Sequence, residues 1–426
     1  MSAAPPPAPA PALGRRLILL LAVACGTAVA NVYFPQAVVP LIAKSLQVSP
    51  ASAAIVVTCA QLGYAAGIFL LVPLGDRLPH RRLITVLLLI TSAGLVLAGT
   101  ATGLLALAAA SALVGAATVV PQVIIPMAAG LTEPERRGAV TGTLLSGLIG
   151  GILLARTFSG TLGQWLGWRA PYLIAAGLVL LLAVAMATAL PATTPTTDQR
   201  YPALLAASWR LLRAEPLLRR SCLYQALVFA GFSAAWTALA LLVTGPRYHL
   251  GTSAVGVIAL VGAASMFATP IAGRRTDRGG PDRVNLICML GALAAAALLL
   301  TGLLGGAAGL VGLGAGMLLL DVAMQSGQVA NQSRIFALRP DARARLNTAY
   351  MTCAFLGGSV GSWLGVRAYS ALGWGGVCAL IALLAGVALV RHLLARPWAP
   401  APRPAAPAGP APAAPAGRED GVPAAR

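Results

Sequence analysis

Residues 121–138 read PQVIIPMAAGLTEPERRG, and residues 327–345 read GQVANQSRIFALRPDARAR. The two stretches align, and each is followed by a Leu-Gly-Trp triplet, which ends at Trp168 in the first copy and at Trp374 in the second. A repeat of this length predicts a chain built from two similar halves. Further aligned pairs are Gln122 with Gln328, Arg137 with Arg343, and Gly151 with Gly357.

The composition places both halves in a membrane. The chain has 426 residues, of which 58% are hydrophobic and only 10% are charged, whereas a soluble domain carries about 25% charged residues. Twelve apolar runs are long enough to cross a hydrocarbon core, which takes about 20 residues. These predicted spans are 17–43, 51–74, 83–103, 104–129, 138–164, 171–190, 221–244, 252–273, 284–304, 306–330, 347–366 and 372–394.

The longest polar interruption divides the spans six and six. We predict an N-terminal six-helix bundle over 15–190, a linker over 191–220 and a C-terminal six-helix bundle over 221–396. Pro/Ala-rich tails at 1–14 and 397–426 lack the apolar pattern of a packed core, and we expect them to be disordered. The predicted fold is therefore an all-α polytopic membrane protein with twelve transmembrane helices in two pseudo-symmetric bundles.

The charge distribution predicts the orientation in the bilayer. The net charge is +19, and most arginines fall in the termini, the linker and every second loop. The other side of the predicted bundle holds only Lys44, Arg169, Arg247 and Arg367. Positive residues favour the cytoplasmic side, so both termini are predicted to be cytoplasmic. The basic residues form no stripe with interleaved aromatic residues, and we therefore expect no nucleic-acid partner.

The sequence offers no set of residues for enzyme chemistry. The six cysteines have no C-x-x-C spacing, and the three histidines are scattered, so no metal site is predicted. A single acid within the spans cannot form a catalytic cluster. We expect neither an enzyme nor a bound cofactor.

Two loops carry a charge motif. Residues 75–82 read GDRLPHRR after the second span, and residues 273–283 read GRRTDRGGPDR after the eighth. They resemble the G-x-x-x-D-R-x-G-x-R signature of the major facilitator superfamily, although the first copy has Val72 and Pro79 where glycines are expected. An acid beside fixed guanidinium groups can form charge-assisted pairs that break on opening. We predict a cytoplasmic gate formed by Asp76, Arg77, Arg81, Asp277, Arg278 and Arg283.

Longer stretches resemble one branch of that family. NVYFPQAVVPLIA, GLIGGILLARTFSG and LLLDVAMQSGQVANQSRIFALRPDARARLNTAYM are similar to bacterial exporters of purine ribonucleosides, arabinose and other sugars. The similarity covers nearly all of residues 15–395. It implies export driven by the proton gradient, in the bacterial inner membrane, by a protein we expect to be a monomer. Gly142, Gly151 and Gly160 resemble the family's antiporter motif, but Ala155-Arg156 stands where Gly-Pro is expected.

Arg156 and Asp321 are the two charged residues that fall in the interior of predicted spans, away from the span ends. Each costs about 2.5–3.5 kcal/mol near the bilayer centre and therefore needs a partner or water. Burial favours the protonated form of a carboxylic acid, whereas a nearby cation favours the ionised form. We predict that Asp321 carries a proton and that Arg156 tunes it; a static structural pair is the alternative.

Uncharged polar and aromatic residues within the spans are predicted to line the substrate cavity. A lipid-facing amide is unfavourable, so these side chains should face a cavity or another helix. Such a set suits a neutral, hydroxylated or planar polar solute. The residues are Asn31, Tyr33, Gln36, Gln61, Tyr64, Gln122, Gln225, Trp236, Gln325, Gln328, Asn331, Asn347 and Tyr350.

The sequence therefore predicts a secondary transporter that exports a small polar solute or drug in exchange for protons by alternating access. One alternative on the same scaffold is a proton-coupled importer of a sugar or nucleoside-like solute. Another is a membrane sensor without transport activity.

Overall fold

The computed structural model describes residues 14–394, except residues 192, 196, 198 and 340–341. Within this part of the chain every regular element is a helix and no strand occurs, which confirms the all-α prediction. The predicted tails, apart from Gly14, lie outside the described residues.

The helices follow the predicted spans. In the first half they are α1 (Arg15–Leu46), α2 (Pro50–Ala53), α3 (Ile55–Leu70), η1 (Val72–Asp76), α4 (His80–Gly99), α5 (Leu104–Ala117), α6 (Val120–Gly130), α7 (Pro134–Leu166) and α8 (Ala170–Ala189). The linker contains α9 (Tyr201–Ala214). The second half contains α10 (Pro216–Thr244), α11 (Thr252–Gly262), η2 (Ala263–Phe267), α12 (Ala268–Leu299), η3 (Leu300–Leu303), α13 (Gly306–Leu338) and α14 (Arg343–Leu393).

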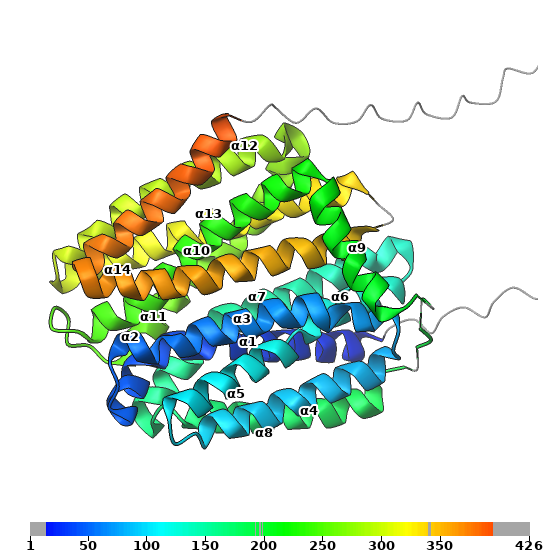
Figure 1. Ribbon diagram of the computed structural model, residues 1–426, viewed down its shortest axis with the longest axis horizontal. Helices are drawn as coiled ribbons and strands as arrows, with labels where there is room; N and C mark the ends of the chain where they lie inside the picture. The colour runs from blue at the N-terminus through cyan, green and yellow to red at the C-terminus, as the bar shows by residue number, and fades with distance from the viewer. Residues whose placement is uncertain (1–13, 192, 196, 198, 340–341, 395–426) are drawn as a thin grey trace, which may run out of the picture.

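Ten helical segments of the described chain are long and apolar enough to cross a membrane. The two further predicted spans arise because α14 contains two spans and because the short helix α11, together with the first arm of α12, forms another. The 51-residue α14 turns back on itself at Gly373 and so contains two spans (Figure 1). The shorter apolar helix α11 leads into the first arm of α12, which ends where Gly280 breaks the helix.

The repeated Gly-Trp pair makes the same turn in both halves. Gly167 has φ 84° and Gly373 has φ 65°, a region that glycine enters without the steric cost of a Cβ atom. The tryptophans that follow, Trp168 and Trp374, are both buried. The sequence repeat therefore reflects a shared need to reverse the chain between the fifth and sixth spans of each half.

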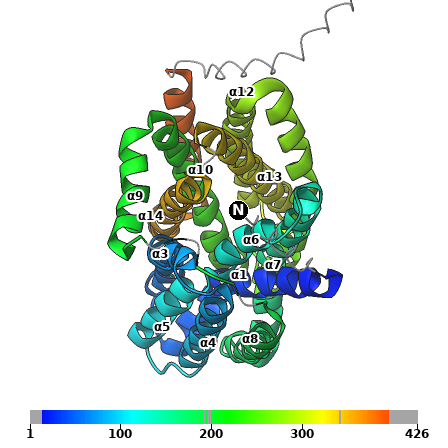
Figure 2. The same ribbon diagram turned by 90° about the vertical axis from the view of Figure 1, so that its right-hand side faces the viewer.

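The two halves lie side by side. In Figures 1 and 2, α1, α3, α4, α5 and α8 form the lower group, and α10, α12, α13 and α14 form the upper group. Between the halves, α3 packs against α14 and α7 packs against α11. We call the end of the bundle that carries residues 191–215 the linker end; it lies at the right of Figure 1.

Glycines allow α1 and α7 to pack closely. A Cβ atom at Gly151 would lie 2.1 Å from the carbonyl oxygen of Gly26, and one at Gly147 would lie 2.4 Å from that of Ala22. The second half uses the same device, since a Cβ atom at Gly361 of α14 would lie 2.1 Å from a backbone oxygen of α10. Small residues at such crossings let helix backbones approach each other in the membrane.

We predict that Gly151→Ala destabilises the protein by about 1–3 kcal/mol, because the added methyl group overlaps the backbone of α1. Gly142→Ala on the same helix is the matched control, since nothing lies within 4 Å of that Cβ position. Melting temperature and the monodisperse fraction in detergent measure the difference. Equal losses in both variants would contradict this account of the packing.

The linker contacts both halves. His80 and Thr193 form a side-chain hydrogen bond of 2.9 Å, and the Tyr201 hydroxyl donates to the Leu70 carbonyl oxygen at 2.6 Å, which ties the linker to the first half. Helix α9 then packs against α14 of the second half (Figure 2). On its exposed side, the Arg213 guanidinium lies 4.9 Å from the Trp209 ring centre.

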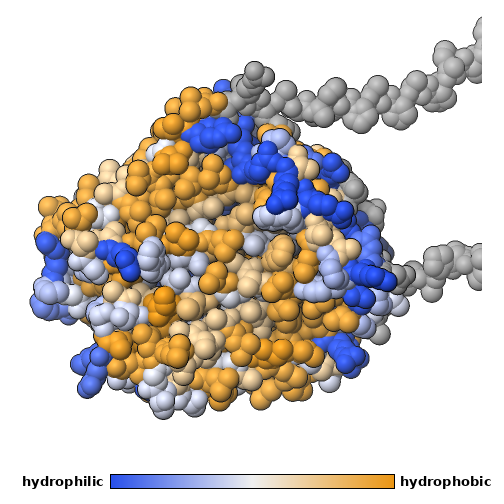
Figure 3. Space-filling model, viewed as in Figure 1, coloured by the Kyte–Doolittle hydropathy of each residue, from blue (hydrophilic) through white to orange (hydrophobic). Residues whose placement is uncertain are grey.

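The outer surface suits a lipid environment. Figure 3 shows hydrophobic side chains over the middle of the molecule and hydrophilic side chains gathered at its ends, chiefly the linker end. Leu105, Leu181 and Val311 are 85%, 68% and 72% exposed. Apolar surface of this extent is rare on soluble monomers and is expected where acyl chains cover the protein. The chain is a multi-pass membrane protein.

Candidate functional site

Arg156 lies where the two halves meet. It is 1% exposed, and its Nε donates a 2.8 Å hydrogen bond to Gln36 Oε1 on α1. Its guanidinium carbon lies 4.1 Å from the ring centre of Trp236, 5.0 Å from that of Tyr33 and 5.5 Å from that of Phe232. Because Trp236 and Phe232 belong to α10, these cation–π contacts connect the first half to the second.

Asp321 lies on α13 and is also 1% exposed. The indole Nε1 of Trp236 donates to Asp321 Oδ1 at 3.3 Å, while Oδ2 of Asp321 has no hydrogen-bond partner in the part of the chain that the structure describes. Gly262 of α11 leaves the space beside Oδ2, since a Cβ atom there would lie 2.4 Å from this oxygen. One long hydrogen bond from a neutral donor does not offset the desolvation of a buried carboxylate.

Trp236 connects the two buried charges. Arg156 and Asp321, both within the described chain, form no ion pair within 4 Å. Instead the face of the indole ring lies against the guanidinium and its N–H points to the carboxylate. The two charges therefore lie on either side of one aromatic ring, and the proton-carrying and tuning roles expected of them stay predictions.

Among the described residues, three buried polar atoms near this ring have no hydrogen-bond partner: Nη2 of Arg156, Nε2 of Gln36 and Oδ2 of Asp321. Buried polar atoms in proteins are normally hydrogen-bonded. Left uncompensated, two charges in the bilayer interior would cost roughly 5–7 kcal/mol. Two donors and one acceptor without partners, next to aromatic faces, could therefore bind a polar solute. The carboxylate oxygen without a partner could bind a proton.

Predicted cavity residues also line the seam between the halves. Gln61 of α3 donates to the Ser233 hydroxyl of α10 at 3.1 Å and accepts from the Ser362 hydroxyl of α14 at 3.4 Å. Nearer the linker end, Asn347 donates to Gln122 Oε1 at 3.4 Å. These amides bond across the seam.

The halves are tied together at the end opposite the linker. The Thr252 hydroxyl donates to the Gly160 carbonyl oxygen and the Thr157 hydroxyl donates to the Gly256 carbonyl oxygen, each at 2.8 Å. A Cβ atom at Gly160 would also lie 2.6 Å from the Thr252 carbonyl oxygen. Helices α7 and α11 therefore close this end of the seam.

Other predicted cavity residues have local partners. The Asn31 amide donates to its own helix, and the Tyr350 hydroxyl donates to Gln225 Oε1 at 2.9 Å within the second half. Tyr64 differs, because its ring centre lies 4.4 Å from that of Phe355 on α14, in the other half. Gln325 donates to the Ser265 hydroxyl at 2.8 Å, and Gln328 is half-buried.

The predicted gate residues lie at the linker end. Asp76 is half-buried at the end of η1, and its carbonyl oxygen accepts from the Thr197 amide at 3.2 Å. The other members are exposed, namely Arg77, Arg81, Asp277, Arg278 and Arg283. In the described chain Asp277 forms no ion pair within 4 Å, so its role in a gate remains a prediction.

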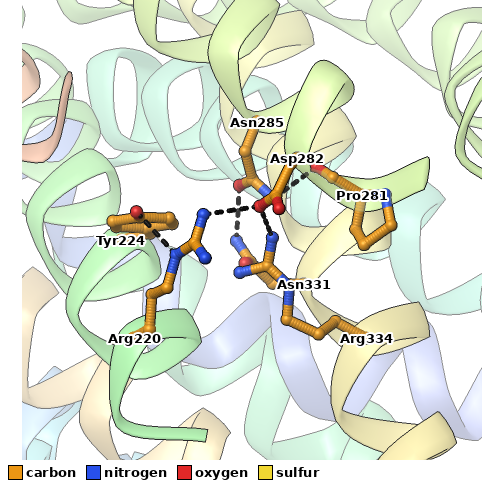
Figure 4. Close-up of polar contacts among 7 residues, drawn as sticks. All are labelled: Arg220, Tyr224, Pro281, Asp282, Asn285, Asn331 and Arg334. Atoms are coloured by element: carbon orange, nitrogen blue, oxygen red, sulfur yellow. Dashed lines mark hydrogen bonds and ion pairs between the residues drawn. The ribbon is translucent and has the colours of Figure 1, made fainter. Parts of the chain in front are cut away.

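A charge cluster that the sequence did not predict joins three helices of the second half. Oδ1 of Asp282, at the start of the second arm of α12, accepts hydrogen bonds from Nη2 of Arg220 at 2.6 Å and from Nη2 of Arg334 (Figure 4). Arg220 Nε also donates to the Tyr224 hydroxyl at 2.8 Å. Asn331, predicted to line the cavity, instead donates to Asn285 beside this cluster at 2.9 Å.

Comparison with known proteins decides the family. The sequence profile of the Major Facilitator Superfamily matches residues 19–362. The chain belongs to the Major Facilitator Superfamily. It is 37% identical to the uncharacterized transporter YgaY of Escherichia coli O157:H7 over 381 residues, which cover 89% of this chain and 95% of YgaY.

This Major Facilitator Superfamily member has two further similarities to known proteins. It is 31% identical to a chloramphenicol resistance protein of Streptomyces lividans over 265 residues, which cover 61% of this chain and 67% of that protein. The crystal structure of the nucleoside transporter NupG superposes with a TM-score of 0.71 at 15% identity, covering 89% of this chain and 98% of NupG. The second similarity shows the shared fold.

Within the superfamily fold, sequence reasoning missed Phe232, Gly262 and the Arg220–Asp282–Arg334 cluster. Phe232 lies one helical turn before Trp236, so its position on the same face of α10 could have been predicted. Arg334 lies beyond the predicted span 306–330, where arginines are expected in loops, whereas α13 continues to Leu338 and includes it. Gly262 gives no sequence signal, because its role depends on where α13 lies.

Proposed function

We propose that this protein is a proton-coupled exporter of a small polar solute. The observation that carries the proposal is the arrangement around Trp236: one buried acid, one buried arginine from the other half, and three polar atoms without partners. Similarity to the chloramphenicol resistance protein supports export as the direction. The cytoplasmic membrane, with both termini and the linker end inside, is the proposed location, on the basis of the arginine distribution.

In this mechanism the proton binds Oδ2 of Asp321, the oxygen without a partner. Protonation leaves a neutral acid that still accepts from Trp236, and release of the proton restores a charge near Arg156. Since Arg156 and Asp321 lie in different halves, rocking of the halves changes the field that the acid feels. An acid that binds protons in one state and releases them in the other can couple a proton gradient to transport.

The proposed solute is uncharged, at least partly planar, and carries both hydrogen-bond acceptors and donors. Acceptors on the solute would meet Nη2 of Arg156 and Nε2 of Gln36, and a donor would meet Asp321. Flat groups would pack on Trp236, Tyr33 or Phe232, which already surround the guanidinium. Hydroxylated and heterocyclic compounds have this chemistry.

Everted membrane vesicles test the direction and the coupling. With an imposed proton gradient, acidic inside, the protein should accumulate its solute in the vesicles, and adding the solute should dissipate the gradient. A panel of neutral hydroxylated and heterocyclic compounds, with vesicles lacking the protein as the control, identifies the solute. Accumulation driven by the opposite gradient would indicate an importer, and binding without flux would indicate a sensor.

Trp236→Phe should lower proton-coupled flux about tenfold, because it keeps an aromatic face for Arg156 but removes the only hydrogen bond to Asp321 in the described chain. A hydrogen bond to a charged group contributes about 1.5–3 kcal/mol. The pH dependence of flux should shift as well. Phe232→Leu, which leaves this hydrogen bond intact, is the control and should leave that pH dependence unchanged.

A further inference from the structure

One exposed face of α9 carries a tryptophan beside arginines. Trp209 is 48% exposed, and Arg210 and Arg213 are exposed as well. Residues three or four apart share a helix face, so these side chains form a single patch. The Arg213 guanidinium lies 4.9 Å from the Trp209 ring centre. Arg219, exposed at the start of α10, donates to the Arg213 carbonyl oxygen and extends the surface. We call these four residues the α9 patch.

The other face of α9 packs against the protein. Leu204, Ala207 and Ser208 are buried, and α9 contacts α14, α10 and η1. With about 3.6 residues per turn, these buried positions and the exposed positions 209, 210 and 213 lie on opposite sides of the helix. The α9 patch therefore points away from the bundle.

Both ends of α9 are fixed at the ends of membrane spans. The Tyr201 hydroxyl donates at 2.6 Å to the carbonyl oxygen of Leu70, the last residue of α3. At its other end α9 stops at Ala214, two residues before α10 begins at Pro216. In Figure 1 α9 runs across the direction of α3 and α14, and in Figure 2, where the spans are seen nearly end-on, it is seen along its length at the left edge. Helix α9 therefore lies along the membrane surface.

A second exposed tryptophan–arginine pair lies toward the opposite surface. The Arg367 guanidinium lies 4.5 Å from the Trp363 ring centre, with the same spacing of four residues in the chain. Trp363 comes 20 residues after Arg343, where α14 begins at the linker end. That separation is about 30 Å along a helix, which equals the thickness of a hydrocarbon core. Tryptophan is enriched at both interfaces of a membrane, so the two pairs fit its two surfaces.

The charge of the α9 patch is positive and is not balanced within the patch. In the described chain Arg210, Arg213 and Arg219 form no ion pair within 4 Å, and the acid between them, Glu215, pairs with Arg339 at 2.9 Å. A cation at the end of α9 is favoured by the helix dipole, which accounts for Arg213 alone. Arg219 lies in the first turn of α10, where the same effect disfavours a cation. An external anion suits this surface.

We propose that the α9 patch binds the head groups of an anionic lipid leaflet. The guanidinium groups of Arg210, Arg213 and Arg219 would donate to lipid phosphate oxygens, which match their N–H donors. The Trp209 ring would lie at the level of the head groups. The cytoplasmic leaflet carries a negative surface potential that attracts basic segments next to a span. The proposal rests on the surface position of α9 and not on the transport mechanism.

The experiment titrates the purified full-length protein in detergent with two lipids and measures melting temperature and lipid retention by native mass spectrometry. Phosphatidylglycerol should bind at least about tenfold more tightly than phosphatidylcholine, which has a phosphate but no net charge, an equivalent of about 1.4 kcal/mol. The preference should shrink as salt is raised, because exposed charges are screened. Equal binding of the two lipids would overturn the proposal. Inorganic phosphate that stabilises the protein as strongly as phosphatidylglycerol would reject the lipid as the source of the anion.

Arg210→Gln/Arg213→Gln should weaken phosphatidylglycerol binding about tenfold and leave phosphatidylcholine binding unchanged. Arg274→Gln/Arg275→Gln removes two exposed arginines of α12 and is the matched control, which should bind phosphatidylglycerol as the unaltered protein does. Because all four side chains are exposed, both variants should fold. Trp209→Ser keeps the charge and should weaken the binding of both lipids. Unchanged phosphatidylglycerol binding in Arg210→Gln/Arg213→Gln would reject the α9 patch as the site.

Discussion

Asp321→Asn is expected to abolish proton-coupled flux while leaving a folded protein. Asparagine matches the shape of the acid and can still accept from Trp236 Nε1, but it cannot take up or release a proton. Burial of the neutral amide also removes the cost of the charge, so the melting temperature should be unchanged or higher. Solute-driven dissipation of an imposed proton gradient in vesicles is the measurement.

The matched control for this variant is Glu133→Gln, an acid-to-amide change at an exposed position at the start of α7. It should leave coupled flux unchanged. Solute exchange without a gradient separates binding from coupling, because Asp321→Asn should still exchange solute across the membrane. Coupled flux at the normal rate in Asp321→Asn would reject the proposed proton site.

Arg156→Gln should reduce coupled flux more than tenfold, an effect of at least about 1.4 kcal/mol on the transport barrier. The substitution removes the cation that favours the ionised form of Asp321 and breaks the contacts to Gln36 and Trp236. It also leaves Asp321 as a buried charge without its counter-charge, which should lower the folded yield. Arg156→Lys keeps the charge but lacks the planar group, and should give an intermediate result.

The double variant Arg156→Gln/Asp321→Asn tests whether the two charges are coupled. Removing both charges leaves nothing uncompensated, so folded yield should recover relative to Arg156→Gln alone, while coupled flux should remain absent. If the loss of folded yield in the double variant equals the sum of the losses in the two single variants, Arg156 and Asp321 do not interact.

The fold could be predicted well from the sequence because its determinants are local. Apolar runs of sufficient length must be helices in lipid, and the Gly167 and Gly373 turns repeat with the sequence. The helix ends were less predictable. Helix α10 begins at Pro216, inside the predicted linker, because α9 and α10 meet there as two helices.

The candidate site was predictable in part. Charged residues within a span are rare, so Arg156 and Asp321 could be identified as candidate site residues. The distance between helices from different halves could not be predicted from the sequence. The partners of the amides were unpredictable for the same reason: Asn331 donates to Asn285, a pairing that depends on how α13 packs against α12. The burial of Arg334 could not be predicted, because an arginine near a helix end is expected to be exposed in a loop; the packing of the helices buries it.

The docking of the linker has a consequence for how far the bundle can open. His80, Leu70 and Asp76 each hold a residue between Thr193 and Tyr201, while α9 rests on the other bundle. Because the linker contacts both halves, a movement that separates the halves at the linker end must break one of these sets of contacts. Helix α9 would have to leave either Leu70 of the first half or α14 of the second.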